Sequence, residues 1–307
     1  PEFEIVILPM ADGGEGTAEA MMSALGGEWI PLTVTGPLSS MKVKAGFAWL
    51  EHEKTAVVEM AVASGLPLLK PAERNPMIAT TYGTGELIKA AIEKGAKKIL
   101  LTVGGSATVD GGVGAAEALG WKFLPDGKIV PPQNLKLPQV DVLCDVTNPL
   151  CGPNGAAHVY GPQKGATPEM VEILDSRLRK LAETVASELG KDILDVPGAG
   201  AAGGLSAGAM AFMNGRLVRG IETVMAVTGL AEALKGADWV LTGEGKFDSQ
   251  SVQGKVVDGV ARLAKQTGAK TGVFAGTVRL TEPEWRAAGI DAVYTLNPPG
   301  MSLDEAI

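Results

Sequence analysis

Six acidic side chains occupy turns that follow short apolar runs of the chain. They are Asp12, Glu15, Asp110, Asp145, Glu244 and Asp248. In an open α/β sheet, ligands gather at the carboxyl ends of the strands, so acids in such turns are candidates to contact a ligand. Helix capping and turn formation are the alternative for each of them taken singly.

The stretch GGSATVDGG, residues 104–112, joins glycines, hydroxyls and one carboxylate directly after the apolar run 99–103. Glycine-rich turns let backbone N–H groups approach an anion, and Ser106 and Thr108 can donate further hydrogen bonds. A carboxylate beside a phosphate is repelled unless a cation lies between them, and Mg²⁺ binds one or two carboxylates together with phosphate oxygens. The combination therefore indicates phosphate chemistry with magnesium.

Three lysines stand among glycines, where a lysine can reach a transferred phosphoryl group and neutralise its growing charge. They are Lys164, Lys246 and Lys255. A solvated surface position is the alternative for each. The two histidines, His52 and His158, form no pattern that indicates a Ser-His-Asp triad.

The segment GAGAAG, residues 198–203, matches the G-x-G-x-x-G pattern of dinucleotide-binding turns. A strand over residues 192–196 and the acid Glu222 would complete such a site, and the function would then be an NAD(P)-dependent oxidoreductase. Pro197 interrupts the step from strand to turn. Two alternatives stay open, a turn that approaches phosphate and a helix packed closely through small residues. No Walker A motif is present.

The overall composition limits the class of protein. The chain has 307 residues, of which 46% are hydrophobic, and a formal net charge of -8. Nucleic-acid binding needs clustered Lys and Arg, so the composition argues against a nucleic-acid partner. The two cysteines, Cys144 and Cys151, indicate neither a disulfide framework nor a zinc site. We expect a soluble cytoplasmic protein with no membrane partner, since no run of residues is apolar enough to span a bilayer.

Short apolar runs alternate with glycine-rich turns and helical periodicity, which is typical of an α/β fold. Strands are expected at residues 4–8, 98–103, 140–144, 239–242, 271–275 and 292–296. Helices are expected at residues 17–25, 114–119 and 256–265. Residues 31–62 predict an antiparallel meander, which suggests an inserted second domain. Residues 125–138 predict an exposed, proline-rich loop.

Seven motifs together resemble the type-1 glycerate kinase family of bacteria. In chain order they are ADGGEGT (11–17), GGSATVDGG (104–112), CDVTNPL (144–150), GPQKGA (161–166), PGAGAAGG (197–204), TGEGKFDSQS (242–251) and GKV (254–256). The resemblance covers essentially the whole chain. Family members usually begin with one further strand, carrying an Ala-Pro-Asp-Ser-Phe-Lys type motif, and end with a further helix.

The resemblance implies ATP-dependent phosphorylation of D-glycerate at the 2-hydroxyl, giving 2-phosphoglycerate, with transfer to the 3-hydroxyl as the alternative. It implies ATP and Mg²⁺ as cofactors. A homo-oligomer stays open, since the sequence does not settle the oligomeric state. It also implies two domains, a flavodoxin-like (Rossmann-like) α/β domain formed by residues 1–30 and 233–307, and an inserted α/β domain over residues 31–232. The active site is expected in the cleft between these domains.

Residue chemistry and the resemblance together give each candidate an expected role. Asp145 or Glu244 holds Mg²⁺, and Asp110 or Asp248 takes or orients the proton of the substrate hydroxyl. The lysines named above steady the transferred group. The expected contacts to ATP or glycerate are Asp12, Glu15, Gly104, Gly105, Ser106, Thr108, Asn148, Gly198, Gly200, Gly203 and Lys255.

Overall fold

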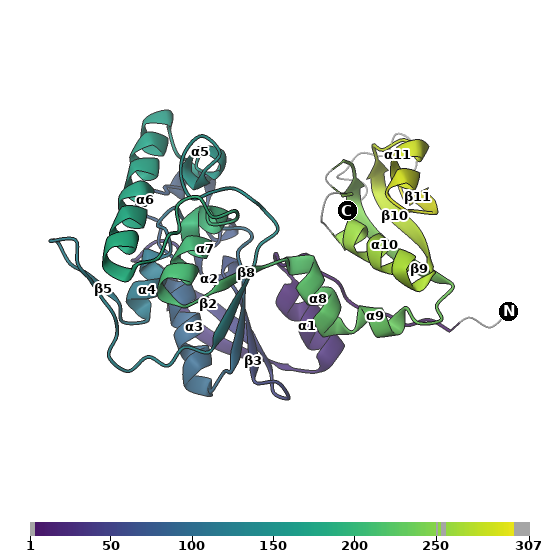
Figure 1. Cartoon of the computed structure of the whole chain (residues 1–307), viewed down its shortest axis with the longest axis horizontal. Helices are drawn as coiled ribbons and strands as arrows, with labels where there is room; N and C mark the ends of the chain where they lie inside the picture. The colour runs from purple at the N-terminus through teal and green to yellow at the C-terminus, as the bar shows by residue number, and fades with distance from the viewer. Residues whose placement is uncertain (1–3, 250, 253–255, 298–307) are drawn as a thin grey trace. The chain divides into compact units, whose positions relative to one another are not determined.

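A computed structural model of the chain describes residues 4–249, 251–252 and 256–297 (Figure 1). The chain divides into two compact units, one made of Pro1–Asp12 with Ile221–Ile307 and the other of Gly13–Gly220. Strands and helices mix in both units, so the expected α/β class is confirmed. The units divide after residues 12 and 220, whereas the sequence analysis placed the domain boundaries after residues 30 and 232. The domain assignment stays a prediction.

A six-stranded sheet forms the centre of the larger unit, in the order β1-β2-β3-β4-β7-β8. Its strands are β1 (Glu28–Thr35), β2 (Lys42–Leu50), β3 (Thr55–Glu59), β4 (Lys98–Thr102), β7 (Gln139–Leu143) and β8 (Arg216–Val218). The expected meander is confirmed, because β1, β2 and β3 pair antiparallel. β3, β4, β7 and β8 run parallel. Their carboxyl ends therefore meet along one side of the sheet, called here the carboxyl edge.

Helices cover this sheet and pack on one another. α1 and α3 contact β2 and β3, α7 contacts β7 and β8, and α4, α5 and α6 each contact α7. The helices are α1 (Thr17–Leu25), α2 (Ala61–Ser64), α3 (Tyr82–Lys94), α4 (Val113–Ala118), α5 (Ala156–Tyr160), α6 (Pro168–Leu189) and α7 (Ala201–Phe212), with 3₁₀ turns η1 (Leu66–Leu68), η2 (Pro71–Glu73) and η3 (Pro162–Lys164). β5 (Lys122–Phe123) and β6 (Ile129–Val130) form a short hairpin. Its second strand lies within residues 125–138, which were expected to be a loop.

The longest helix, α6, shows how local sequence sets these elements. The Thr167 side chain accepts a hydrogen bond from the Met170 N–H, and Pro168 occupies the first turn, so both usual start signals are present. Gly190 ends the helix with a left-handed backbone, φ 65°. Between these ends, apolar residues recur at helical spacing and are buried, among them Leu174 and Leu178. The helix therefore presents one apolar stripe to the unit's core.

Parallel strands supply the centre of that core. All five residues of β3 are buried, and in β4 all but Lys98 are buried. Such continuous apolar runs are typical of strands that are covered on both faces. The largest fully buried side chains include Phe47, Leu87 and Leu100.

The smaller unit holds a parallel sheet in the order β11-β10-β9. Its strands are β9 (Trp239–Phe247), β10 (Lys270–Val278) and β11 (Ala292–Thr295), and its helices are α8 (Gly220–Thr228), α9 (Leu230–Ala233), α10 (Val256–Thr267) and α11 (Glu282–Ala287). α10 packs on β9 and β10, where Val257, Val260 and Ala261 are buried. In the described part of the chain, no helix combines the length and apolarity needed to cross a membrane.

Two of the strands predicted from the sequence are absent from the structure. Residues 4–8 form no strand, and Ile5 and Ile7 are 79% and 83% exposed. A strand needs a neighbour that pairs with its backbone, and among the described strands none pairs with this segment. Residues 192–196 also form no strand. In addition, β9 continues through Phe247, so most of the turn expected at residues 243–248 is strand.

Candidate functional site

Two glycine-rich loops meet at the carboxyl edge of the larger unit. Residues 104–108 follow β4, and the loop that contains Gly14 and Glu15 lies against them. A Cβ added to Gly104 would lie 3.2 Å from the Gly14 Cα, and one added to Gly105 would lie 2.5 Å from Glu15 Oε1. Gly104 therefore permits a close approach to the backbone of Gly14, and Gly105 leaves room for the Glu15 side chain.

Hydrogen bonds on both sides of Ser106 fix its position. The Leu66 N–H donates to the Gly105 carbonyl at 2.7 Å, and the Ala107 N–H donates to the Ser64 carbonyl at 2.9 Å. Gly105 has a left-handed backbone, φ 71°, which turns the chain after β4. The loop is therefore held to the segment after α2 as well as to its own strand.

Lys164 extends from η3 into this loop. Its side chain is almost fully buried, with 2% of the residue exposed. Its Nζ donates to Ser106 Oγ at 2.7 Å and to the Thr108 carbonyl oxygen at 2.8 Å. Burial lowers the pKa of Lys164 to about 7, and the negative charge of Asp110 opposes this only in part. Three of the residues predicted from the sequence, Ser106, Thr108 and Lys164, are thus in contact.

Asp110 serves as a cap in this structure. Its Oδ2 accepts hydrogen bonds from the N–H and hydroxyl of Thr81 and from the Gly114 N–H, and its Oδ1 accepts from the Gly112 N–H. Burial raises the pKa of this carboxyl, while these hydrogen bonds lower it. Because donors already surround both oxygens, the arrangement favours the capping alternative over the expected proton transfer.

The glycines of residues 198–204 pack against protein backbone. A Cβ added to Gly203 would lie 1.9 Å from the Thr108 carbonyl oxygen, and one added to Gly200 would lie 2.3 Å from the Pro149 carbonyl oxygen. Gly198 and Gly200 both donate their N–H to the Asn148 carbonyl. With no strand at residues 192–196, the dinucleotide-binding interpretation is not supported. The alternative of close packing through small residues describes this segment.

Asp145 and Asn148 lie in the loop after β7. Asp145 Oδ1 accepts a hydrogen bond from the Gly220 N–H at 3.0 Å, and the residue is exposed. The Tyr160 hydroxyl donates to Asn148 Oδ1 at 2.6 Å, and Asn148 Nδ2 donates to the Asn154 carbonyl. Asp145 is thus a carboxylate presented at the carboxyl edge, whereas the Asn148 amide ties its own loop together.

Glu59 is a buried acid that the sequence analysis did not select. It ends β3, is 7% exposed, and accepts a hydrogen bond from the Ala18 N–H at 2.8 Å near the start of α1. Burial raises its pKa, and the charge of Glu15 adds to this. An acid at the end of an apolar run is the signal that selected Asp110 and Asp145, so the same signal could have found Glu59.

Five predicted residues belong to the smaller unit, and the structure describes four of them. Glu244 lies in β9, with its Oε1 buried and with no hydrogen-bond partner in the described part of the chain. Lys246 and Asp248 form an ion pair at 2.7 Å. Asp12 is exposed near the boundary of this unit. Lys255 lies outside the described residues.

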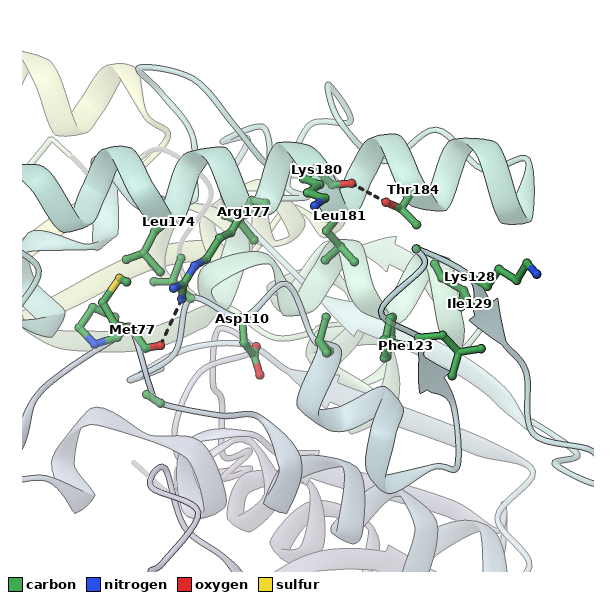
Figure 2. A pocket seen from close by; sticks show the side chains of 17 residues that line it. Met77, Asp110, Phe123, Lys128, Ile129, Leu174, Arg177, Lys180, Leu181 and Thr184 are labelled. Atoms are coloured by element: carbon green, nitrogen blue, oxygen red, sulfur yellow. Dashed lines mark hydrogen bonds between the residues drawn. The ribbon is translucent and has the colours of Figure 1, made fainter.

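A pocket of about 390 Å³ lies between α6, residues 76–79 and the β5–β6 hairpin (Figure 2). Its walls are mainly apolar and include Val113, Phe123, Leu174 and Leu178. Asp110 also lines it, but Ser106 and Lys164 do not. Lys128, Arg177, Lys180 and Thr184 also line the pocket, and Arg177 Nη1 donates to the Met77 carbonyl oxygen. We assign no ligand to it.

Within the described ranges, no three His, Cys, Asp or Glu side chains cluster as a metal site. Magnesium in kinases takes many of its ligands from phosphate and water and needs only one or two carboxylates from the protein. Asp145 is an exposed carboxylate of the kind that this coordination requires. The donor set therefore fits Mg²⁺ bound together with a polyphosphate.

The geometry and fold thus describe an α/β protein with glycine-rich, anion-compatible loops, a buried lysine and an exposed carboxylate at one edge of a sheet. The sequence profile of the glycerate kinase family matches residues 1–137 and 129–307. The chain belongs to the glycerate kinase family. It is therefore a kinase, an enzyme that transfers a phosphoryl group to an alcohol.

Individual relatives agree with this membership. The chain is 44% identical to the glycerate kinase of Halalkalibacterium halodurans, over 100% of this chain and 85% of that protein. It is 43% identical to the glycerate 2-kinase of Escherichia coli K12, over 100% of this chain and 85% of that protein. It is also similar to a crystal structure from Salmonella typhimurium LT2, described provisionally as glycerate kinase 2. That likeness has a TM-score of 0.86 and 42% identity, and covers 97% of this chain and 83% of the other.

Proposed function

We propose that this protein phosphorylates D-glycerate at its 2-hydroxyl, with ATP as the phosphoryl donor and Mg²⁺ as the metal, to give 2-phosphoglycerate. Family membership supports the kinase activity, and the E. coli relative is named glycerate 2-kinase. The contact of Lys164 with Ser106 at 2.7 Å is the observation that carries the proposal. It joins a lysine amine, a hydroxyl and a glycine-rich loop, whose N–H and O–H donors together suit an anionic substrate.

In this proposal, phosphoryl transfer depends on positioning and on neutralising charge. The backbone of Gly104 and Gly105 and the Ser106 hydroxyl bind anionic oxygens. Asp145 binds Mg²⁺, which when present neutralises phosphate charge. The roles of Glu244 and Lys246 stay predictions from the sequence. We leave Asp110 out of the catalytic set because its oxygens already accept hydrogen bonds from Thr81, Gly112 and Gly114.

The direct test is turnover of purified protein with ATP, Mg²⁺ and D-glycerate, followed by ADP release, with the product identified by phosphorus NMR. The 2-phosphoglycerate resonance supports the proposal. A 3-phosphoglycerate resonance instead establishes the alternative regiochemistry, and no ADP release with D-glycerate refutes the substrate assignment.

The variant Asp145→Asn tests the metal assignment. We expect turnover to fall by about a hundred-fold and the Mg²⁺ concentration for half-maximal rate to rise, because one anionic ligand is lost. Asp126→Asn is the matched control. Asp126 is exposed in the turn between β5 and β6, and its carboxylate forms a solvent-exposed ion pair with Lys128. Unchanged Mg²⁺ dependence in Asp145→Asn contradicts the assignment.

We further propose that the protein acts in the cytoplasm and forms a homo-oligomer. Sedimentation equilibrium measures the second point, and a mass equal to one chain at micromolar concentration contradicts it.

A further inference from the structure

Lys164 is buried without an ionic partner. The residue is 2% exposed, and its Nζ contacts a hydroxyl, Ser106 Oγ, and a carbonyl, Thr108 O. Among the described residues, no carboxylate lies within ion-pair distance of this Nζ. A buried ammonium that lacks a carboxylate partner loses solvation without compensation, so burial favours the neutral amine.

Three charged residues lie around this lysine. Asp110 acts on it through its charge, which raises the pKa of Lys164, but its oxygens are held by donors at Thr81, Gly112 and Gly114. The backbone of Arg74 packs on Gly165, the next residue in the chain. Glu15 packs on Gly105, beside Ser106. Burial outweighs these charges, and the pKa of Lys164 is about 7.

Ser106 lies between the buried Lys164 amine and the surface of the loop at residues 104–108. It is 8% exposed, and its loop is fixed on both sides by hydrogen bonds to residues 64–66. A neutral Lys164 has one lone pair and two N–H groups. It can therefore accept the Ser106 hydroxyl proton at 2.7 Å while it still donates to the Thr108 carbonyl.

We infer that Lys164, acting through Ser106, accepts the proton of the glycerate hydroxyl during phosphoryl transfer. The inference rests on the proposed function, in which the Ser106 loop binds anionic oxygens, and it takes these to be the oxygens of glycerate. It replaces the carboxylates that the sequence analysis offered for this task with a serine–lysine relay. The Asp110 oxygens already accept four hydrogen bonds, from Thr81, Gly112 and Gly114, whereas the Ser106 oxygen can serve both Lys164 and a ligand.

The glycerate hydroxyl oxygen forms a bond to the γ-phosphorus of ATP as the bond from that phosphorus to the ADP oxygen breaks, and ADP keeps the electron pair. The hydroxyl proton passes to Ser106 Oγ, and the Ser106 proton passes to Lys164 Nζ, which becomes an ammonium. The ammonium later returns its proton to solvent.

The test is the pH dependence of kcat and KM, measured with saturating ATP and Mg²⁺ for the wild type, Ser106→Ala, Lys164→Met and Lys164→Arg. For the wild type, kcat should rise about ten-fold per pH unit below pH of about 7 and level off above it. Ser106→Ala and Lys164→Met should lose about a hundred-fold in kcat, and the rise near neutral pH should disappear. Lys164→Arg keeps a cation but cannot accept a proton in this range, so it should fail in the same way.

Ser187→Ala and Lys180→Met are the matched controls, because both residues are exposed on α6. Their kcat and pH profile should equal those of the wild type. Circular dichroism and ATP binding of each variant show whether it is folded. If folded Ser106→Ala, or a folded Lys164 variant, keeps kcat within three-fold and keeps the pH profile, the relay is refuted. A wild type that produces no phosphoglycerate from glycerate instead refutes the proposed function.

Discussion

The buried Lys164 makes a quantitative prediction about stability and pH. The change from an ordinary pKa of 10.5 to about 7 corresponds to about 5 kcal/mol of preference for the neutral amine in the folded state. The unfolded chain keeps Lys164 protonated up to about pH 10, whereas the folded chain releases this proton near pH 7. The unfolded state therefore binds more protons in this window, and the free energy of unfolding rises with pH.

The magnitude follows from the same linkage relation. Between about pH 7 and about pH 9, the Lys164 contribution to the free energy of unfolding should rise by about 2 kcal/mol. Lys164→Met removes the titrating group, so the difference in stability between wild type and variant should change by this amount over the same range. Lys180→Met is the control, because its amine lies on the exposed side of α6.

Urea unfolding at a series of pH values is the assay, followed by circular dichroism and by tryptophan fluorescence, to which Trp29, Trp49 and Trp121 of the same unit contribute together with Trp239 and Trp285 of the smaller unit. The control and the wild type should show parallel curves of stability against pH. If the curve of Lys164→Met also runs parallel to the wild type within about 0.5 kcal/mol, Lys164 is not held in the environment described here.

Two further stability predictions concern other buried contacts. Gly203→Ala should destabilise the larger unit by about 3 kcal/mol or more in urea unfolding, because its Cβ would lie 1.9 Å from the Thr108 carbonyl at φ 65°. Gly190→Ala has the same φ and open space around it, so it should cost only about 1 kcal/mol; equal losses would show that strain rather than the clash decides. Asp141→Asn should cost about 3 kcal/mol at neutral pH, since Asp141 is buried against Arg216 and Lys98. Burial raises the pKa of Asp141, but its hydrogen bonds and these cations outweigh burial and lower it, so this stabilisation should be present above about pH 4 and lost on further acidification. An acid-unfolding profile that is the same for wild type and Asp141→Asn would contradict this assignment.

The sequence predicts elements whose signals are local. The helix at residues 17–25 and the strands at 98–103 and 271–275 have their apolar periodicity and their breaking residues within a few positions. The strand expected at residues 4–8 has the same apolar signal and is absent, since a strand also needs a partner that local sequence does not name. β9 is longer than expected because pairing with β10 continues through glycines that were interpreted as a turn.

The candidate site shows the same limit of sequence-based prediction, because local sequence does not indicate which distant residues come into contact. Both Ser106 and Lys164 are candidates from their residue type and neighbours, but they are 58 positions apart, and no local pattern indicates that they touch. Asp110 is predicted from the sequence as an acid at the site, and its contact with Thr81, which is 29 positions away, is not indicated by any local pattern. The glycines at residues 198–204 match a nucleotide motif. In the structure, Gly203 and Gly200 are needed because the carbonyls of Thr108 and Pro149 leave no room for a Cβ atom. Roles that depend on long-range packing were therefore beyond the sequence pattern.

The hydrogen bond from the Gly220 amide to Asp145 Oδ1 joins the exposed carboxylate to the first residue of α8. A cation that draws on this oxygen competes with the amide for the same electron density. The opening turn of α8 would then lose part of its anchorage whenever the carboxylate is engaged. If Asp145 binds Mg²⁺ as proposed, hydrogen–deuterium exchange at the Gly220 amide should therefore rise when the metal is added, which can be measured without turnover.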